Sequence, residues 1–312
     1  MKHYDYGINI DKLRVCLNTP DGLYEHLKEH YSYLDQQKHR IYDEGEFYLR
    51  FIDEDEHNMT ALVHIRDSDG DQLLGSLEFN NTSKYIGKTF FTFENKALYK
   101  SFVKLNDGEK HNYICIALYI FDFLGLTFNN ITELELALDT PFNYIRKIRS
   151  LIKNVKKYDL ILNGRMVKDY EEILNGYGEY FTRSRVELSK YPTIYHSHAK
   201  ATDLSMKVYD KTREMTESTP HKLSYLPEWL GWDNTDQIYR VEVRLHNTNV
   251  RDFCNRYGKN LYPDSGEHSN VLSLLGLNKF RMALFFDTIN RLMYFRLKST
   301  NAPVYITDFV GI

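Results

Sequence analysis

The fold is decided by ELELALD, residues 133–139, and by two later stretches with the same pattern, MKVYDK at 206–211 and YRVEVRL at 239–245. Apolar and polar residues alternate in all three, and this alternation predicts a β-strand with one buried face and one polar face. If the three strands are neighbours, helices cover the apolar face of their sheet. The polar face then gathers carboxylates, basic side chains and one tyrosine.

The rest of the chain mixes helical and strand-like segments, with hairpins between consecutive strands. Helical spacing of apolar residues predicts helices, and short alternating runs between turn residues predict strands. We therefore expect an α+β fold: a central, mainly antiparallel β-sheet with helices packed on one face, a catalytic polar face and a helical C-terminal region. The predicted helices span residues 20–42, 110–126, 141–157 and 271–297, and further strands span 46–52, 60–66, 158–166, 180–187 and 192–211.

The composition excludes several classes of protein. Hydrophobic residues make up 42% of the 312 residues, which is enough for a core and excludes global disorder. The 40 basic and 43 acidic residues give a net charge of −3, so a nucleic acid would need a local basic patch. The 3 widely spaced cysteines are typical of a reducing compartment. The first residues lack the apolar region of a signal peptide, and the longest apolar run, residues 113–126, is too short to span a membrane. We therefore expect a cytoplasmic protein without a membrane partner.

The polar face of the three predicted strands has the residue types needed to act on a phosphodiester. Carboxylates from adjacent strands bind Mg²⁺ or Mn²⁺, which prefer oxygen ligands, and Lys and Arg beside them suit a phosphate. A tyrosine hydroxyl in such a place is a candidate nucleophile. The alternative is an ordinary half-exposed sheet with cross-strand ion pairs, and alternation alone does not identify a reaction.

These stretches resemble the replication initiation factor family of rolling-circle plasmids, the Rep-trans type, which also includes conjugative relaxases and some phage initiators. ITELELALD (131–139) is similar to the family's acidic strand, and YRVEVRL to its strand with the pattern Arg-x-Glu-x-Arg. PTIYHSHAKATDLSMKVYDKTRE (192–214) is similar to its strand pair that ends in Tyr-Asp-Lys. The recognisable core covers about residues 131–245. Glu133, where the family usually has Arg, and Ser197, where Gly is frequent, depart from the pattern.

The resemblance implies a role for each matching residue. Tyr209 is the expected nicking tyrosine, and the expected ligands of a divalent metal are Glu135, Asp139 and Glu242. Lys211, Arg240 and Arg244 would steady the scissile phosphate or the carboxylates. The resemblance also implies a DNA nicking and strand-transfer domain over residues 1–250, a mainly helical region over 251–312, a homodimer and a host helicase as a possible partner.

A basic segment, RKIRSLIKNVKK (146–157), directly follows the acidic strand and contains six basic residues and no acid. Its apolar residues fall on one stripe of a helix, which can dock on the sheet. We expect the other side to contact the phosphates of origin DNA. The alternative is a solvated helix face. The residues predicted to bind DNA are Arg146, Arg149, Lys153, Lys156 and Lys157.

Some other features have competing interpretations. His196 and His198 alternate as metal-binding histidines do, but exposed histidines of a strand or turn are the more ordinary interpretation. Trp229 and Trp232 could stack on unpaired bases, although aromatic residues in such a segment more often anchor a loop. Three alternative tyrosines, more often packing residues than nucleophiles, are Tyr191, Tyr195 and Tyr225.

The resemblance therefore implies an enzyme that initiates rolling-circle replication, whether of a plasmid or of a phage. It would nick origin DNA, single-stranded or in a cruciform, with Mg²⁺ or Mn²⁺ and religate it through a 5′-phosphotyrosine. Three alternatives stay open at this point: a conjugative relaxase of the same family, a metal-dependent nuclease that uses water, and a DNA-binding protein without catalytic activity. A covalent protein–DNA adduct is expected for an initiator or a relaxase, but not for a nuclease that uses water or for a DNA-binding protein.

Overall fold

The protein divides into two compact units, which are described one after the other. The computed structural model describes residues 7–167, 194–261 and 270–309, apart from gaps at 31, 34–39, 55–57, 68–69, 81–84, 101, 105–109, 199–200 and 234–235. Unit 1 comprises Met1–Asn9, Glu135–Phe253 and Asn278–Ile312, and unit 2 comprises Ile10–Leu134 and Cys254–Leu277. The expectation that residues 1–250 form the DNA nicking and strand-transfer domain, with a separate region over 251–312, stays a prediction.

The sheet of unit 1 contains the three stretches with alternating residues. Its strands lie in the order β13 (Ile194–His198), β14 (Ala201–Asp210), β15 (Tyr239–Leu245) and β10 (Thr127–Thr140), the last of which enters the unit at Glu135. β14 pairs antiparallel with both β13 and β15. In the second of these pairs Tyr209 lies opposite Arg240, and Lys207 lies opposite Glu242. The expectation that these strands are neighbours is confirmed.

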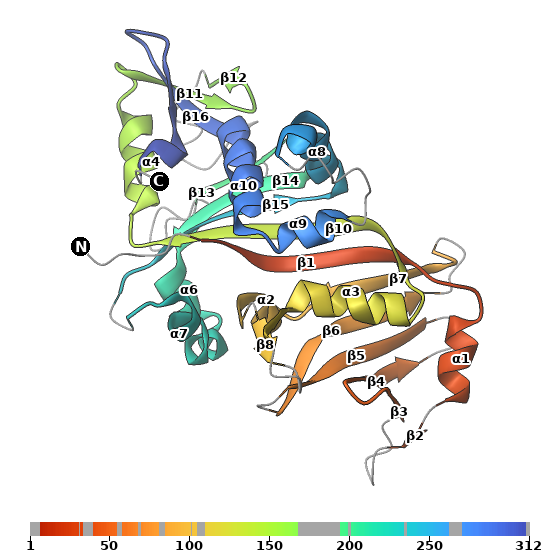
Figure 1. Ribbon diagram of the computed structural model, residues 1–312. Coiled ribbons are helices and arrows are strands. Elements are labelled where there is room, and N and C mark those ends of the chain that lie inside the picture. The colour runs from red at the N-terminus through yellow and green to blue at the C-terminus, as the bar shows by residue number, and fades with distance from the viewer. Residues whose placement is uncertain are drawn as a thin grey trace. The chain divides into compact units, whose positions relative to one another are not determined.

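Helix α10 (Asn278–Leu292) covers the apolar face of this sheet (Figure 1) and contacts β13, β14 and β15. The side chains of Val208, Val241 and Val243 are fully buried, as are Leu284 and Phe285 of the helix. Fully burying such a side chain stabilises the fold by about 1.5–3 kcal/mol. This apolar layer holds the strands in place, so that their polar side chains all stand on the other face.

The remaining elements of unit 1 surround this sheet. Helix α4 (Tyr144–Lys153) buries Ile145, Ile148 and Ile152, and it contacts β11 (Tyr158–Leu162) and β14. A second sheet has the order β12 (Arg165–Met166), β11, β16 (Met293–Leu297) and β17 (Pro303–Tyr305). The predicted hairpin over residues 158–166 is confirmed, with its turn at Asn163 and Gly164, both at positive φ. The other elements are α6 (Lys211–Glu217), η1 (Pro220–Ser224), α7 (Leu226–Leu230), α8 (Asn247–Leu261) and η2 (Ile306–Phe309).

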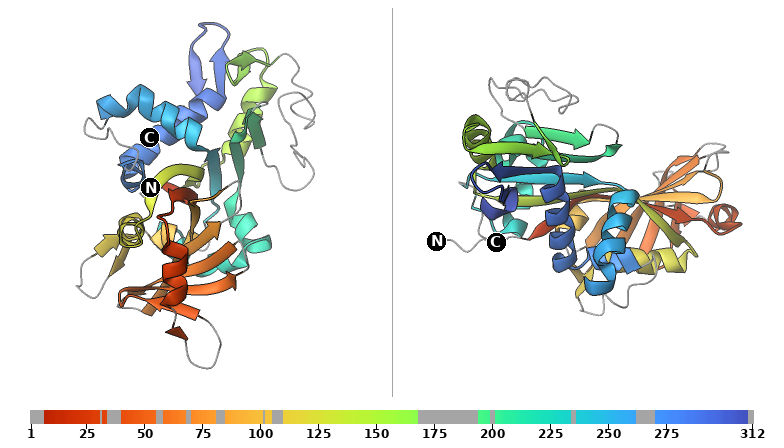
Figure 2. Two further views of the ribbon diagram at one scale, coloured as in Figure 1. Left: turned by 90° about the vertical axis from the view of Figure 1, so that its right-hand side faces the viewer. Right: turned by 90° about the horizontal axis from the view of Figure 1, so that it is seen from above.

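The strands of unit 2 form an antiparallel array, on one face of which helix α3 (Tyr113–Phe123) lies (Figure 2). After β1 (Ile8–Asn18), the strand order is β7 (Lys88–Phe93), β6 (Gly70–Asn80), β5 (Asn58–Asp67), β4 (Phe47–Glu54), β3 (Arg40–Asp43) and β2 (Ser32–Tyr33). The helix buries Ile116, Ile120 and Phe121. The smaller elements are α1 (Leu23–Glu29), α2 (Asn95–Lys100), β8 (Phe102–Lys104), β9 (Lys110–Asn112) and α9 (Asn270–Leu275).

The predicted fold class is confirmed, with a helical C-terminal region, but several predicted boundaries were wrong. The predicted helix over 20–42 is only α1, and Arg40–Asp43 is a strand that pairs with β4. The helical pattern over 271–297 breaks into α9 and α10, and Met293–Leu297 is a strand because it pairs with β11. The predicted strand over 180–187 lies outside the described residues. Among the helices that are described, none is both long and apolar enough to cross a membrane.

Candidate active site

The polar face of the unit 1 sheet carries a hydrogen-bonded group of three side chains, centred on Glu242. The Tyr209 hydroxyl donates a hydrogen bond to Glu242 Oε2 at 3.0 Å, and Lys207 Nζ donates one to Glu242 Oε1 at 2.8 Å. Lys207 and Tyr209 are alternate residues of β14 and therefore point to the same side. The Glu242 side chain is only 4% exposed. The predicted nucleophile thus lies beside a buried carboxylate that can accept its proton.

Lys207 keeps its positive charge beside Glu242. Burial acts to lower the pKa of Lys207, but the charges of Glu242 and Glu135 and the hydrogen bond to Glu242 outweigh it, so the pKa lies above its ordinary value. The ammonium group therefore partly neutralises Glu242, which makes a buried carboxylate tolerable next to the other acid. It also provides a cation on the face where a phosphate would bind.

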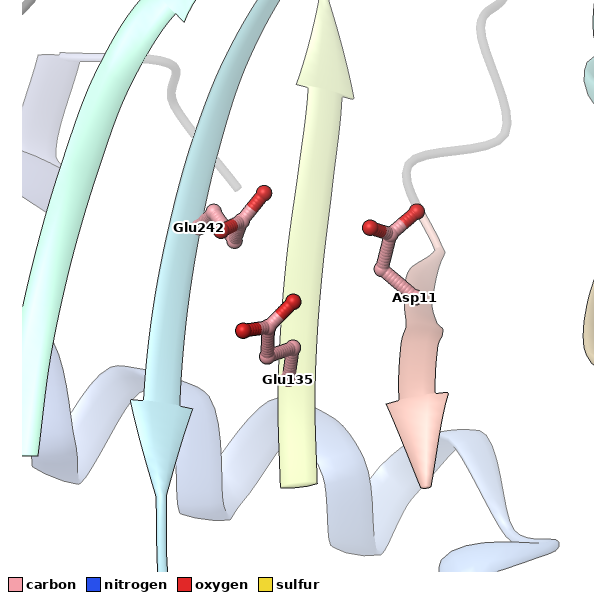
Figure 3. Close-up of side chains that lie close together, drawn as sticks. All are labelled: Asp11, Glu135 and Glu242. Carbon is pink, nitrogen blue, oxygen red and sulfur yellow. The ribbon is translucent and has the colours of Figure 1, made fainter. Parts of the chain in front are cut away.

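Glu135 and Glu242 form an acidic pair on the same side of their strands, β10 and β15 (Figure 3). One carboxylate oxygen of Glu135 lies within 4.8 Å of one carboxylate oxygen of Glu242. On the other side of Glu135, its Oε1 is 3.9 Å from Arg244 Nε. The structure thus brings together Glu135, Glu242 and Arg244 of the predicted site.

Asp139 and Arg240 form a separate, buried ion pair. The pair is bidentate: Arg240 Nε donates a hydrogen bond to Asp139 Oδ1 at 2.6 Å, and Arg240 Nη2 donates one to Asp139 Oδ2 at 2.7 Å. The Arg240 and Asp139 side chains are 0% and 3% exposed. Both oxygens of Asp139 are therefore used by the guanidinium group, and the structure does not bring Asp139 into the acidic pair with Glu135. Its predicted role as a metal ligand stays a prediction.

Lys211 is buried and paired with an acid of its own helix. It is the first residue of α6, its side chain is 1% exposed, and its Nζ contacts Glu214 Oε2 at 2.6 Å. Burial acts to raise the pKa of Glu214, but Lys211 and the hydroxyl of Thr219 outweigh burial and hold it below its ordinary value. Lys211 also lies over the ring of Tyr209, with Nζ 5.9 Å from the ring centre. Its predicted role in steadying the scissile phosphate or the carboxylates stays a prediction.

A pocket of about 710 Å³ opens beside Tyr209, between α4 and α6. Three of the predicted DNA-binding residues line it, namely Arg146, Arg149 and Lys153. The opposite side is lined by Asp210, Arg213 and Glu217, and Tyr239 lines it from β15. The basic side of α4 and Tyr209 therefore both line this cavity, as the prediction of a phosphate-binding helix near Tyr209 requires. The Tyr209 hydroxyl itself is directed to Glu242 on the polar face.

The other predicted residues lie away from this cavity. Lys156 and Lys157 are exposed and follow the end of α4 at Lys153, and Lys157 contacts the ring of Tyr158. Tyr225 is buried and packs against Trp229, with ring centres 4.9 Å apart, which agrees with an anchoring role. Tyr191 lies outside the described residues.

Sequence reasoning missed several features of the site. Lys207 was assigned to the polar face, but its contact with Glu242 depends on the register of β14 and β15, which the sequence does not reveal. Asp210 and Tyr239 line the pocket because α6 turns away from β14 at that point. The strand β1 was also missed, although the alternation in INIDKLRV, which includes the Asp11 labelled in Figure 3, was a usable signal for it.

Comparison with known proteins shows a weak structural similarity. No protein-family model and no curated protein matches the chain. A solved structure of a rolling circle replication initiator protein from Geobacillus stearothermophilus is similar over 82% of this chain and 80% of its own, with 13% sequence identity and a TM-score of 0.33. This similarity is too low to place the chain in a family.

Proposed function

We propose that the protein nicks and rejoins DNA through a covalent bond to Tyr209 and so initiates rolling-circle replication. The observation that carries the proposal is the position of the Tyr209 hydroxyl, which is bonded to the buried Glu242 carboxylate on the polar face. Tyr209 also lines a cavity that cations of α4 line. Of the residues that resemble the initiator family, Tyr209, Glu135, Glu242 and Arg244 lie together on this face. Origin DNA is therefore the proposed partner.

The proposed reaction exchanges one phosphoester for another. The Tyr209 oxygen attacks the phosphorus of a DNA phosphodiester while its proton passes to Glu242 Oε2. The bond from phosphorus to the 3′ oxygen breaks, and that oxygen takes a proton from water to become a free 3′-hydroxyl. The 5′-phosphate stays on Tyr209, which conserves the ester and allows the reverse reaction to close the strand. Lys207 and Arg244 lie on the same face and suit the charge of the phosphate.

Glu135 and Glu242 fit a divalent cation such as Mg²⁺ or Mn²⁺. Both provide oxygen ligands, and Mg²⁺ is usually held by one or two carboxylates, with phosphate oxygens and waters as the other ligands. Such an ion supplies Lewis-acid stabilisation of charge on the phosphate. We propose a different role for Asp139 and Arg240, whose buried pair connects β10 to β15 and holds the two strands that carry the acids.

A search for a covalent adduct tests the proposal. The protein is incubated with Mn²⁺ and a pool of single-stranded DNA that has a random central region, and denaturing electrophoresis then separates protein-linked DNA. We expect an adduct that resists denaturant, and peptide mapping after nuclease digestion should locate the nucleotide remnant on Tyr209. Cleavage without any linked protein would instead show a nuclease that uses water, and binding without cleavage would show a DNA-binding protein.

Removal of one carboxylate should weaken metal binding. We expect Glu135→Gln to lower the affinity for Mn²⁺ at least about tenfold, because even loss of an outer contact to a metal ligand costs about 10–100-fold. Titration followed by electron paramagnetic resonance measures this affinity without DNA. Asp287→Asn, which removes an acid paired with Arg291 on α10, is the matched control and should leave the affinity unchanged. Equal Mn²⁺ affinity of Glu135→Gln and wild type would contradict the assignment.

The basic side of α4 should control affinity for DNA more than cleavage. Replacing Arg146, Arg149 and Lys153 with Gln removes the α4 cations that line the pocket. We expect weaker binding of specific and nonspecific single strands. The salt dependence of log K should become flatter by about 0.7 for each phosphate that the variant no longer binds. Binding isotherms at several salt concentrations measure both effects.

A control variant removes the same charge elsewhere in unit 1. The exposed cations Lys279, Arg291 and Lys298 are replaced with Gln in this variant. It should keep the wild-type salt slope within the precision of the measurement. If the α4 variant behaved like this control, α4 would be only a solvated surface.

A further inference from the structure

We propose that the pocket between α4 and α6 binds one nucleotide of the cleaved strand and that Asp210 selects a base with an exocyclic amino group. This inference rests on the proposed function and adds a recognition site to it. The pocket volume of about 710 Å³ is in the range of small-molecule sites and is enough for a nucleotide. All of its lining residues belong to unit 1.

The two sides of the pocket differ in charge, and this fixes the direction of a bound nucleotide. Arg146, Arg149 and Lys153 lie on the α4 side, where a phosphate would be attracted. Asp210 and Glu217 lie on the α6 side, where a phosphate would be repelled. The sugar–phosphate backbone should therefore run along α4, with the base directed towards α6.

One carboxylate oxygen of Asp210 accepts hydrogen bonds within the protein, and the other can accept one from a ligand. Its Oδ1 accepts hydrogen bonds from the backbone N–H of Arg213 at 3.0 Å and from Gln237 Nε2 at 2.6 Å. Within the described part of the chain, Oδ2 accepts no hydrogen bond, and the nearby guanidinium of Arg213 is bound to Glu217 at 2.9 Å. Burial, with the charge of Glu217, raises the pKa of Asp210 despite the two bonds to Oδ1. A donor from a ligand would offset this loss of hydration.

The chemistry of Oδ2 determines which bases it can accept. A carboxylate oxygen only accepts hydrogen bonds, so it pairs with the amino groups of adenine, cytosine or guanine. Thymine offers only its ring N3–H, which lies between two carbonyl oxygens, so a carboxylate that accepts from it also meets the repulsion of these oxygens. A hydrogen bond to a charged group is worth enough to discriminate about tenfold or more, which is the effect to look for.

The test uses Tyr209→Phe protein, which retains bound DNA without cleaving it. Random single-stranded pools are selected for binding and sequenced, and the result does not depend on whether wild type forms an adduct. We expect one position of the selected strand to be depleted of thymine about tenfold or more. Direct binding of oligonucleotides that differ only in thymine or cytosine at this position should give the same ratio.

Asp210→Asn then exchanges the acceptor for a donor. Asn also caps a helix, and its oxygen can keep the two bonds that Oδ1 now accepts, so the amide NH₂ replaces Oδ2. Depletion of thymine should disappear in this variant, while Asp287→Asn in the same background should retain it. A selected pool with no thymine-depleted position, or an unchanged depletion with Asp210→Asn, would overturn the proposal. Thermal unfolding of each variant verifies that it is folded.

Discussion

Tyr209→Phe is expected to abolish the covalent adduct completely while leaving the fold and DNA binding intact. The substitution removes only the hydroxyl, so no atom remains that can form the phosphoester bond. The ring keeps its contact with Lys211, and Glu242 keeps the hydrogen bond from Lys207. The measurement is the amount of protein-linked DNA on a denaturing gel, with binding measured separately by fluorescence anisotropy.

Tyr294→Phe is the matched control for this experiment. Tyr294 lies on β16, in the second sheet of unit 1, where its ring centre is 5.8 Å from that of Tyr305. We expect it to form the adduct at a rate near that of wild type. An adduct at wild-type level in Tyr209→Phe would show that another nucleophile is used.

The second large effect is expected on stability, at the buried pair of Asp139 and Arg240. Removing one partner leaves the other charge buried without compensation, which costs about 3–5 kcal/mol. We therefore expect Arg240→Met alone, or Asp139→Leu alone, to shift urea denaturation strongly to lower concentration. The double variant should recover most of the loss, because apolar residues of similar volume can replace a buried ion pair at little cost.

The double variant also tests the role of Asp139. If Asp139 only holds β10 against β15, the folded double variant binds Mn²⁺ as wild type does. If Asp139 is a metal ligand, Mn²⁺ affinity falls although the protein is folded. A double variant that is no more stable than either single variant would contradict the view that the two charges compensate each other.

The alternation of residues was enough to predict the strands of the site, whereas the partners of their side chains were not predictable. Val208, Val241 and Val243 marked the buried face because period-two burial is a local property of a strand. The alternation also put Asp139 on the polar face. Its ion pair with Arg240 was not predictable, because it depends on the register between β10 and β15. MYFRL (293–297) continues a helical pattern and becomes a strand only because β11 is available to pair with it.

The end of β14 is a rigid place for a nucleophile and has a consequence for how target preference can change. Tyr209 is the second-to-last residue of β14, directly before α6 begins, and its strand is paired on both sides. Strands hold side chains more accurately than loops do. The surrounding residues of α4 and α6 can therefore be exchanged, in evolution or by design, to select a different DNA sequence. The hydroxyl oxygen of Tyr209 keeps its position in such variants.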